Sequence, residues 1–168
     1  MKKKSSTWRQ DSSNLDIQNQ IQEELTTNYE KYYRLAFSYV KNEPDAMDIV
    51  QEGAYKAILN SSQVKEKSYI GTWIYRIIIN EALNYIKKFK KPYTELDLVT
   101  AHVHDTYEDF DLKKALEALE EPDKTIVKLR FFEDMQLVEI ADVTSENVNT
   151  VKSRLYRAMK KLRILMEE

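Results

Sequence analysis

Apolar residues recur at spacings of three and four over most of the chain, and this period predicts helices rather than strands. The predicted helices cover about 25–40, 44–59, 68–88, 112–119, 122–132, 136–143 and 148–165. Polar segments separate them, and Pro44 suits the first turn of the second helix. The pattern therefore predicts an all-α protein.

The last predicted helix has the most regular apolar stripe. Its members follow one another at spacings of 3, 4, 3, 4 and 3 and are Val148, Val151, Leu155, Ala158, Leu162 and Leu165. The segment 149–163 also holds six cations, mostly off that stripe, and no acid. A short helix over 136–143, a polar turn over 144–147 and this longer helix with a basic outer face predict a helix-turn-helix.

One stretch of the chain, 92–110, has little helical period, five acids and no Lys or Arg. Such a composition is typical of a linker, so we expect two small helical domains joined by an acidic linker, the second a helix-turn-helix domain. The expected division is a polar N-terminal arm over 1–24, a first domain over 25–91, the linker over 92–110 and a second domain over 111–168.

Composition excludes several classes of chemistry. The chain has no Cys, and its two glycines cannot form a dinucleotide or phosphate-binding loop. His102 and His104 are too few ligands for a metal site, so we expect no metal, no cofactor and no enzyme activity. The longest aliphatic run is 77–79, and no apolar segment follows the charged start, so a soluble intracellular protein is expected.

The net charge of −2 by itself does not indicate a partner. The basic run within 149–163 matters more, because phosphate binding depends on local charge rather than on the chain's average. Such a run can also be an ordinary solvated helix face, so charge alone leaves both interpretations open.

Three stretches, in order, resemble the extracytoplasmic-function (ECF) sigma factors of bacterial RNA polymerase. Residues 32–57 (YYRLAFSYVKNEPDAMDIVQEGAYKA) and 71–88 (GTWIYRIIINEALNYIKK) are similar to sigma region 2, and 124–163, with its string TVKSRL, is similar to region 4. The resemblance implies a protein that binds core RNA polymerase, directs it to promoters with −10 and −35 elements and helps to melt the DNA. It implies no small-molecule substrate.

The resemblance also implies where the polymerase binds. Asp48, Gln51 and Glu52 would meet the clamp helices of the largest subunit, and Asp48 and Glu52 share one helix face at i, i+4. Phe131 and Phe132 would meet the flap of the second-largest subunit.

For promoter DNA, the resemblance implies two sets of contacts. In the −10 set, aromatic rings would stack on unpaired bases while cations hold phosphates. This set is Lys56, Tyr69, Trp73, Tyr75, Arg76 and Asn80, and a specificity loop would lie over about 60–71. The −35 set on the recognition helix is Asn149, Thr150, Lys152, Ser153, Arg154, Arg157, Lys160 and Lys161. The turn departs from the family pattern, because Ser145 replaces a glycine and Glu146 takes a usually apolar place.

The family resemblance further implies an anti-sigma factor, often membrane-anchored, and a role in an envelope-stress response in the cytoplasm. Two alternatives remain at this stage. A conventional helix-turn-helix regulator would bind duplex DNA specifically without polymerase, and a protein-binding adaptor would tolerate neutralisation of Lys152 and Arg154.

Overall fold

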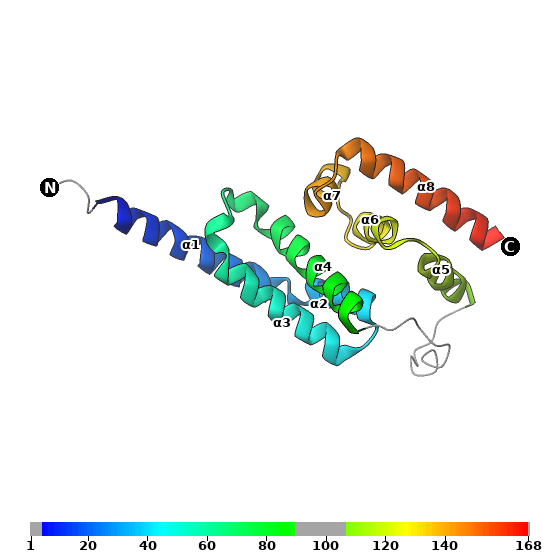
Figure 1. Ribbon diagram of the computed structural model, residues 1–168, viewed down its shortest axis with the longest axis horizontal. Helices are drawn as coiled ribbons and strands as arrows, with labels where there is room; N and C mark the ends of the chain where they lie inside the picture. The colour runs from blue at the N-terminus through cyan, green and yellow to red at the C-terminus, as the bar shows by residue number, and fades with distance from the viewer. Residues whose placement is uncertain (1–4, 90–106, 168) are drawn as a thin grey trace. The chain divides into compact units, whose positions relative to one another are not determined.

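The computed structural model describes residues 5–89 and 107–167, with side chains from 14 and from 112 in the two ranges. The chain divides into two compact units, Met1–Lys91 and Pro92–Glu168 (Figure 1). Within the described ranges all regular structure is helical, as the apolar period predicts. No helix in these ranges is both long enough and apolar enough to cross a bilayer.

The first unit is a bundle of four α-helices with two short 3-10 turns between the third and the fourth. In order they are α1 (Ser5–Thr27), α2 (Tyr29–Val40), α3 (Glu43–Leu59), η1 (Ser61–Gln63), η2 (Lys67–Tyr69) and α4 (Ile70–Phe89). Helices α2, α3 and α4 pack against one another around the fully buried Tyr32, Ile74 and Ile78.

The expected N-terminal arm over 1–24 is wrong from Ser5 onward, because that segment forms most of α1. Ile21 is fully buried and Leu25 nearly so. They lie four residues apart, so a narrow apolar edge on an otherwise polar helix packs onto the bundle. The predicted helix over 25–40 is also interrupted, at Asn28, whose side-chain amide donates to Glu24 Oε1 at 2.9 Å.

Helix α3 begins as the sequence predicts, with Pro44 in its first turn. Asn42 is the N-cap, and its Oδ1 accepts a hydrogen bond from the backbone amide of Asp45 at 2.9 Å. Farther along α3, Gly53 is buried against Ile78 of α4, and a β-carbon there would overlap the isoleucine side chain. This glycine therefore lets the two helices approach closely.

The second unit contains α5 (Tyr107–Glu117), α6 (Glu121–Phe131), α7 (Leu137–Thr144) and α8 (Val148–Glu167). Its core includes Ala115, Leu119, Val127, Ala158 and Leu162. Because α5 begins at Tyr107, the last residues of the expected linker over 92–110 are helical. The remainder of that linker, with His102 and His104, lies outside the described residues.

Helices α7 and α8 form the predicted helix-turn-helix without a glycine in the turn. Ser145 adopts the left-handed conformation, with φ 56° and ψ 36°, which costs about 1–2 kcal/mol for a residue with a β-carbon. The backbone amide of Glu146 then donates to Ala141 O at 3.0 Å, which ends α7. The atypical turn sequence is thus compatible with the motif.

Candidate nucleic-acid and protein interfaces

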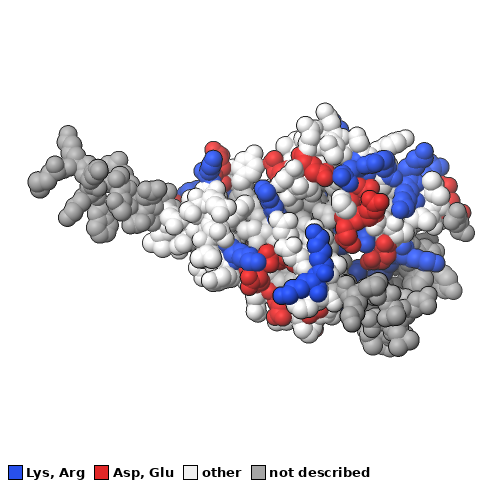
Figure 2. Space-filling model, viewed as in Figure 1, with Lys and Arg blue, Asp and Glu red and all other residues white. Residues whose placement is uncertain are grey.

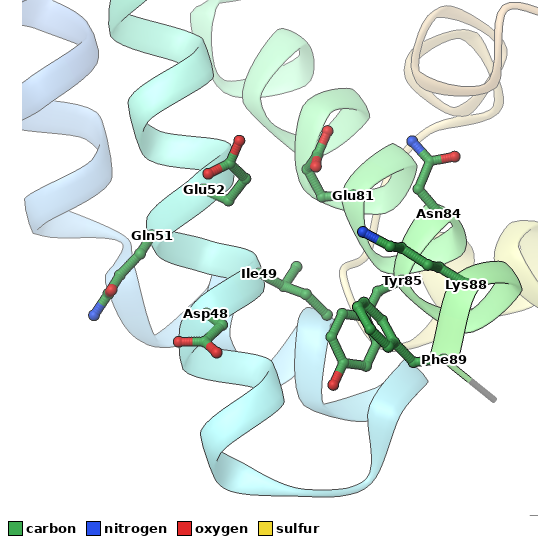
Figure 3. A pocket seen from close by; sticks show the side chains of 9 residues that line it. All are labelled: Asp48, Ile49, Gln51, Glu52, Glu81, Asn84, Tyr85, Lys88 and Phe89. Carbon is green, nitrogen blue, oxygen red and sulfur yellow. The ribbon is translucent and has the colours of Figure 1, made fainter.

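A surface cleft of about 500 Å³ lies between α3 and α4 in the first unit (Figure 3). Its α3 side includes Asp48, Gln51 and Glu52, the three residues that sequence analysis assigned to polymerase binding. All three are exposed. Glu81 and Lys88 of α4 lie on the opposite side, so the cleft is lined by charged and amide groups from both helices.

Lys56 connects the two sides of this cleft. Its Nζ lies 2.7 Å from Glu81 Oε2 and 3.3 Å from Glu52 Oε1. The hydrogen bond that the Lys56 ammonium donates to Glu81 raises the pKa of Lys56, and burial opposes that shift. Lys56 thus joins α3 to α4 through two carboxylates, and its role as a −10 phosphate contact stays a prediction.

Tyr85 supports the same cleft, and sequence analysis missed it. A hydrogen bond from its hydroxyl to the Asp45 carboxylate raises the pKa of Tyr85 to about 12, with burial as the next cause. Its ring packs on Phe89 with centroids 4.8 Å apart (Figure 3). Tyr85 therefore holds α4 against the first turn of α3, one turn before Asp48.

Four of the residues assigned to the −10 element form a stripe along α4 and the turn before it. Tyr69, Trp73, Arg76 and Asn80 follow at spacings of 4, 3 and 4, which places them on one helix face. Tyr69, Arg76 and Asn80 are exposed, and Trp73 is half-buried. The stripe thus presents two aromatic rings and one cation on the same surface.

Tyr75 does not belong to that stripe. It is 9% exposed and packs edge-to-face on Tyr32 with centroids 5.0 Å apart. The expectation that Tyr75 contacts DNA is therefore wrong for this structure. Its place two residues after Trp73 turns its ring toward the bundle core.

The loop over 60–71 is braced by α1, a contact that sequence analysis did not predict. Ser61 is 1% exposed, and its Oγ donates to Asn14 Oδ1 at 2.9 Å. Farther along, Lys67 Nζ lies 2.5 Å from Asp16 Oδ2, and this contact lowers the pKa of the Asp16 carboxyl. Helix α1 thus contacts the loop at two points through polar side chains.

In the second unit, most residues assigned to the −35 element are exposed on α8. The exposed members are Asn149, Thr150, Lys152, Ser153, Arg157, Lys160 and Lys161. Val151, Ala158 and Leu162 form the buried stripe of the same helix, as predicted. Figure 2 shows Lys and Arg side chains gathered over α8, with acidic side chains beside them.

Arg154 differs from its neighbours on α8. Its side chain is only 26% exposed, and Nη1 lies 3.0 Å from Asp123 Oδ1 of α6. Its Nε lies 3.3 Å from Glu146 Oε2 in the turn, an ion pair without the alignment of a hydrogen bond. The expectation that Arg154 lies free on the DNA-facing surface is therefore wrong.

Phe131 and Phe132, at the end of α6, are 57% and 62% exposed. Arg130 beside them donates from Nη1 to Met135 O at 2.9 Å, which fixes the chain that follows α6. Two adjacent exposed phenylalanines are unusual on a solvated surface and are typical of a protein-binding patch. No metal-binding group of three or more acidic, His or Cys residues occurs among the described residues.

Two helical units, one of them a helix-turn-helix with a basic outward face, define a protein of the DNA-binding transcription class. The sequence profile of Sigma-70 region 2 matches residues 25–91, and that of Sigma-70, region 4 matches residues 109–162. The chain belongs to the ECF group of the sigma-70 family of RNA polymerase sigma factors. The resemblance in the sequence is thereby confirmed.

Relatives cover most of the chain. It is 45% identical over 144 residues to the RNA polymerase sigma factor SigV of Bacillus subtilis, covering 83% of this chain and 87% of the relative. It is 33% identical over 133 residues to an ECF RNA polymerase sigma-E factor of Haemophilus influenzae, covering 68% of this chain and 70% of the relative.

Solved structures share the fold. The sigma factor RpoE of Bartonella quintana, in complex with the anti-sigma factor NepR, superposes with a TM-score of 0.70 at 22% identity, covering 87% of this chain and 96% of that one. CnrH, in complex with the cytosolic domain of CnrY, gives 0.68 at 20% identity, covering 88% and 87%.

Proposed function

We propose that this chain binds core RNA polymerase, directs it to promoters that carry matching −10 and −35 elements, and helps to open the DNA. The polymerase supplies the catalysis, and the chain itself acts as no enzyme. The observation that carries the proposal is that one chain of this family presents both an exposed acidic face on α3 and an exposed basic face on α8.

For polymerase binding we propose two surfaces. Asp48, Gln51 and Glu52 present an acidic and amide face to the clamp helices, where opposite charge gives steering and register. Phe131 and Phe132 offer an apolar anchor for the flap, because burying exposed aromatic rings against a partner contributes strongly to the free energy of binding.

At the −10 element we propose that the stripe of Tyr69, Trp73, Arg76 and Asn80 captures the melted strand. Aromatic rings stack on unpaired bases, a cation holds phosphate, and an amide can hydrogen-bond a base edge. The loop over 60–71 lies immediately before this stripe in the sequence and would hold an unstacked base.

At the −35 element we propose that the first half of α8 enters the major groove, as the second helix of a helix-turn-helix does. Lys152 and Ser153 lie near its start and would contact base edges or phosphates, together with Asn149 and Thr150. Arg157 and Lys160, farther along α8, would contact the phosphate backbone of the DNA.

These assignments give a division of the chain that the two compact units support. Residues 25–91 act as region 2, and α1 supports this region through its contacts with the loop over 60–71. Residues 111–168 act as region 4. The acidic segment 92–110 joins them.

We also propose control by an anti-sigma factor, membrane-anchored, that holds the chain inactive in the cytoplasm until envelope stress releases it. The support is that one structural neighbour, the sigma factor RpoE, is bound to the anti-sigma factor NepR, and that another, CnrH, is bound to the cytosolic domain of CnrY.

A binding experiment tests the proposal. Purified bacterial core polymerase is mixed with the full chain, and in parallel the chain alone is titrated with duplex promoter DNA. We expect a stable complex with core polymerase and weak binding to DNA alone. Tight, specific duplex binding without any complex with polymerase, under conditions where another sigma factor binds, would instead indicate a conventional regulator.

A further inference from the structure

The cations of α8 separate into two groups by helical position. Those on the outward side are Lys152, Arg157, Lys160 and Arg163. Arg154 and Lys161 are seven residues apart, which places them together along one flank beside the buried stripe. The flank position of Arg154 follows from its spacing, three residues after Val151 and four before Ala158.

Arg154 is held by acids from two different segments. Asp123, from the first turn of α6, is 17% exposed, and Glu146, from the turn before α8, is 25% exposed. Asp123 accepts a hydrogen bond from Nη1, and Glu146 forms an ion pair with Nε, so two nitrogens of the guanidinium have an acidic partner. Because these groups are largely withdrawn from water, salt screens the contacts less than it screens the exposed cations.

Glu146 has a second role in the same place. Its backbone amide closes α7 by donating to Ala141 O at 3.0 Å, while its carboxylate meets Arg154. The residue that departs from the family's apolar pattern thus joins the end of α7 to the beginning of α8.

Lys161 makes the corresponding contact one heptad later. Its Nζ donates to Ala118 O at 2.8 Å, directly after the last residue of α5. A cation at the C-terminal end of a helix satisfies a free carbonyl and complements the helix dipole. The flank of α8 is therefore tied to α6 by Arg154 and to α5 by Lys161.

We propose that Arg154 and Lys161 are positioning residues that set the orientation of α8, and that only the outward cations contact promoter DNA. Asp123 and Glu146 belong to this positioning group, although neither touches the nucleic acid. The inference rests on the proposed −35 binding by α8. It reverses one expectation, because neutralising an acid near DNA ordinarily strengthens binding, whereas here it releases the recognition helix.

The test uses the full chain assembled with core polymerase on two promoters that differ only in a matched or scrambled −35 element. The variants are Asp123→Asn, Glu146→Gln and Lys152→Ala, with Glu167→Gln as the control, because Glu167 pairs with Arg163 in an exposed i, i+4 contact. Promoter affinity is measured as a function of salt, and thermal melting is followed for each variant.

We expect Asp123→Asn and Glu146→Gln to reduce the advantage of the matched −35 element by about tenfold, in the range for one coupled ion-pair network. The salt slope should stay unchanged, because no phosphate contact is lost. Lys152→Ala should reduce binding and lower the slope by about 1. Glu167→Gln frees Arg163, one of the outward cations, so it should keep the full advantage of the matched −35 element and bind promoter DNA as tightly as the parent protein or more tightly.

A charge swap separates positioning from simple loss of stability. Arg154→Asp alone should abolish the −35 preference, and Arg154→Asp combined with Asp123→Arg should recover a large part of it. A double variant that melts like the parent but stays without −35 preference overturns the inference, as does stronger promoter binding by Asp123→Asn or by Glu146→Gln. If Lys152→Ala also leaves binding and slope unchanged, the proposed −35 role of α8 fails as well.

Discussion

Reversing the charges of Asp48 and Glu52 should detach the chain from core polymerase while leaving its fold intact. Both side chains are exposed on α3, and Asp48→Lys with Glu52→Lys changes the local charge by four units. An exposed ion pair contributes about 0.2–1 kcal/mol, and reversal replaces each attraction with a repulsion of similar size. Two such sites give about 1–4 kcal/mol, or roughly fivefold to several-hundredfold in Kd.

The cost to the fold is smaller. Glu52 shares Lys56 with Glu81, so its reversal replaces one exposed i, i+4 attraction with a repulsion of similar size, a cost of about 1 kcal/mol, and leaves the shorter contact between Lys56 and Glu81 in place. The matched control is Glu23→Lys with Glu30→Lys, which makes the same change of charge on exposed positions of α1 and α2.

Fluorescence anisotropy of labelled chain against core polymerase, at low and at physiological salt, measures the effect. The loss should be largest at low salt, because exposed charges are screened over about 8–10 Å near physiological ionic strength. Equal affinity of the variant and the parent at low salt, or the same loss in the control, would refute the assignment of the clamp face to α3.

Three further predictions concern the first unit. Tyr75→Ala should lower the free energy of unfolding by about 3 kcal/mol, as loss of a buried aromatic does, whereas Arg76→Ala should impair promoter opening with little change in urea unfolding. Asn14→Ala should lower the free energy of unfolding by about 1–2 kcal/mol, measured by thermal melting, because the buried Ser61 hydroxyl loses its hydrogen-bond acceptor. The raised pKa of Tyr85 contributes stability that is present below pH 10 and is lost as pH rises toward 12, so urea unfolding at pH 8 and pH 11 should differ less in Tyr85→Phe.

The sequence was sufficient to predict the helix-turn-helix and the stripe on α4. The apolar residues of α8 repeat so regularly that only one face can be buried, and Tyr69, Trp73, Arg76 and Asn80 follow the same period. The stripe also shows why Tyr75 should have been assigned to the core, because it lies two residues from Trp73 on another face.

Helix α1 was missed because its apolar edge is narrow. Among residues 14–24, whose side chains the structure describes, the buried apolar residue is Ile21. Polar contacts such as that of Asn14 with Ser61 depend on a loop far along the chain. The local sequence contains no signal of such a distant partner, so composition alone favoured a loose arm.

Arg154 was misplaced for a different reason. Composition places Arg154 among six cations of one helix, whereas its spacing from Val151 and Ala158 puts it at the edge of the buried stripe. That spacing can be read from the sequence alone. Its partners Asp123 and Glu146 are brought to it by the packing of α6 and the left-handed turn at Ser145, which the sequence pattern did not reveal.

Transcription from a promoter library by core polymerase, with and without the chain, tests the central claim most directly. The proposed function predicts new transcripts that start only on promoters sharing a −10 and a −35 sequence, and that decrease with Lys152→Ala or with Arg76→Ala. Transcripts whose start sites do not change when the chain is added, although the chain is bound to polymerase, would contradict it.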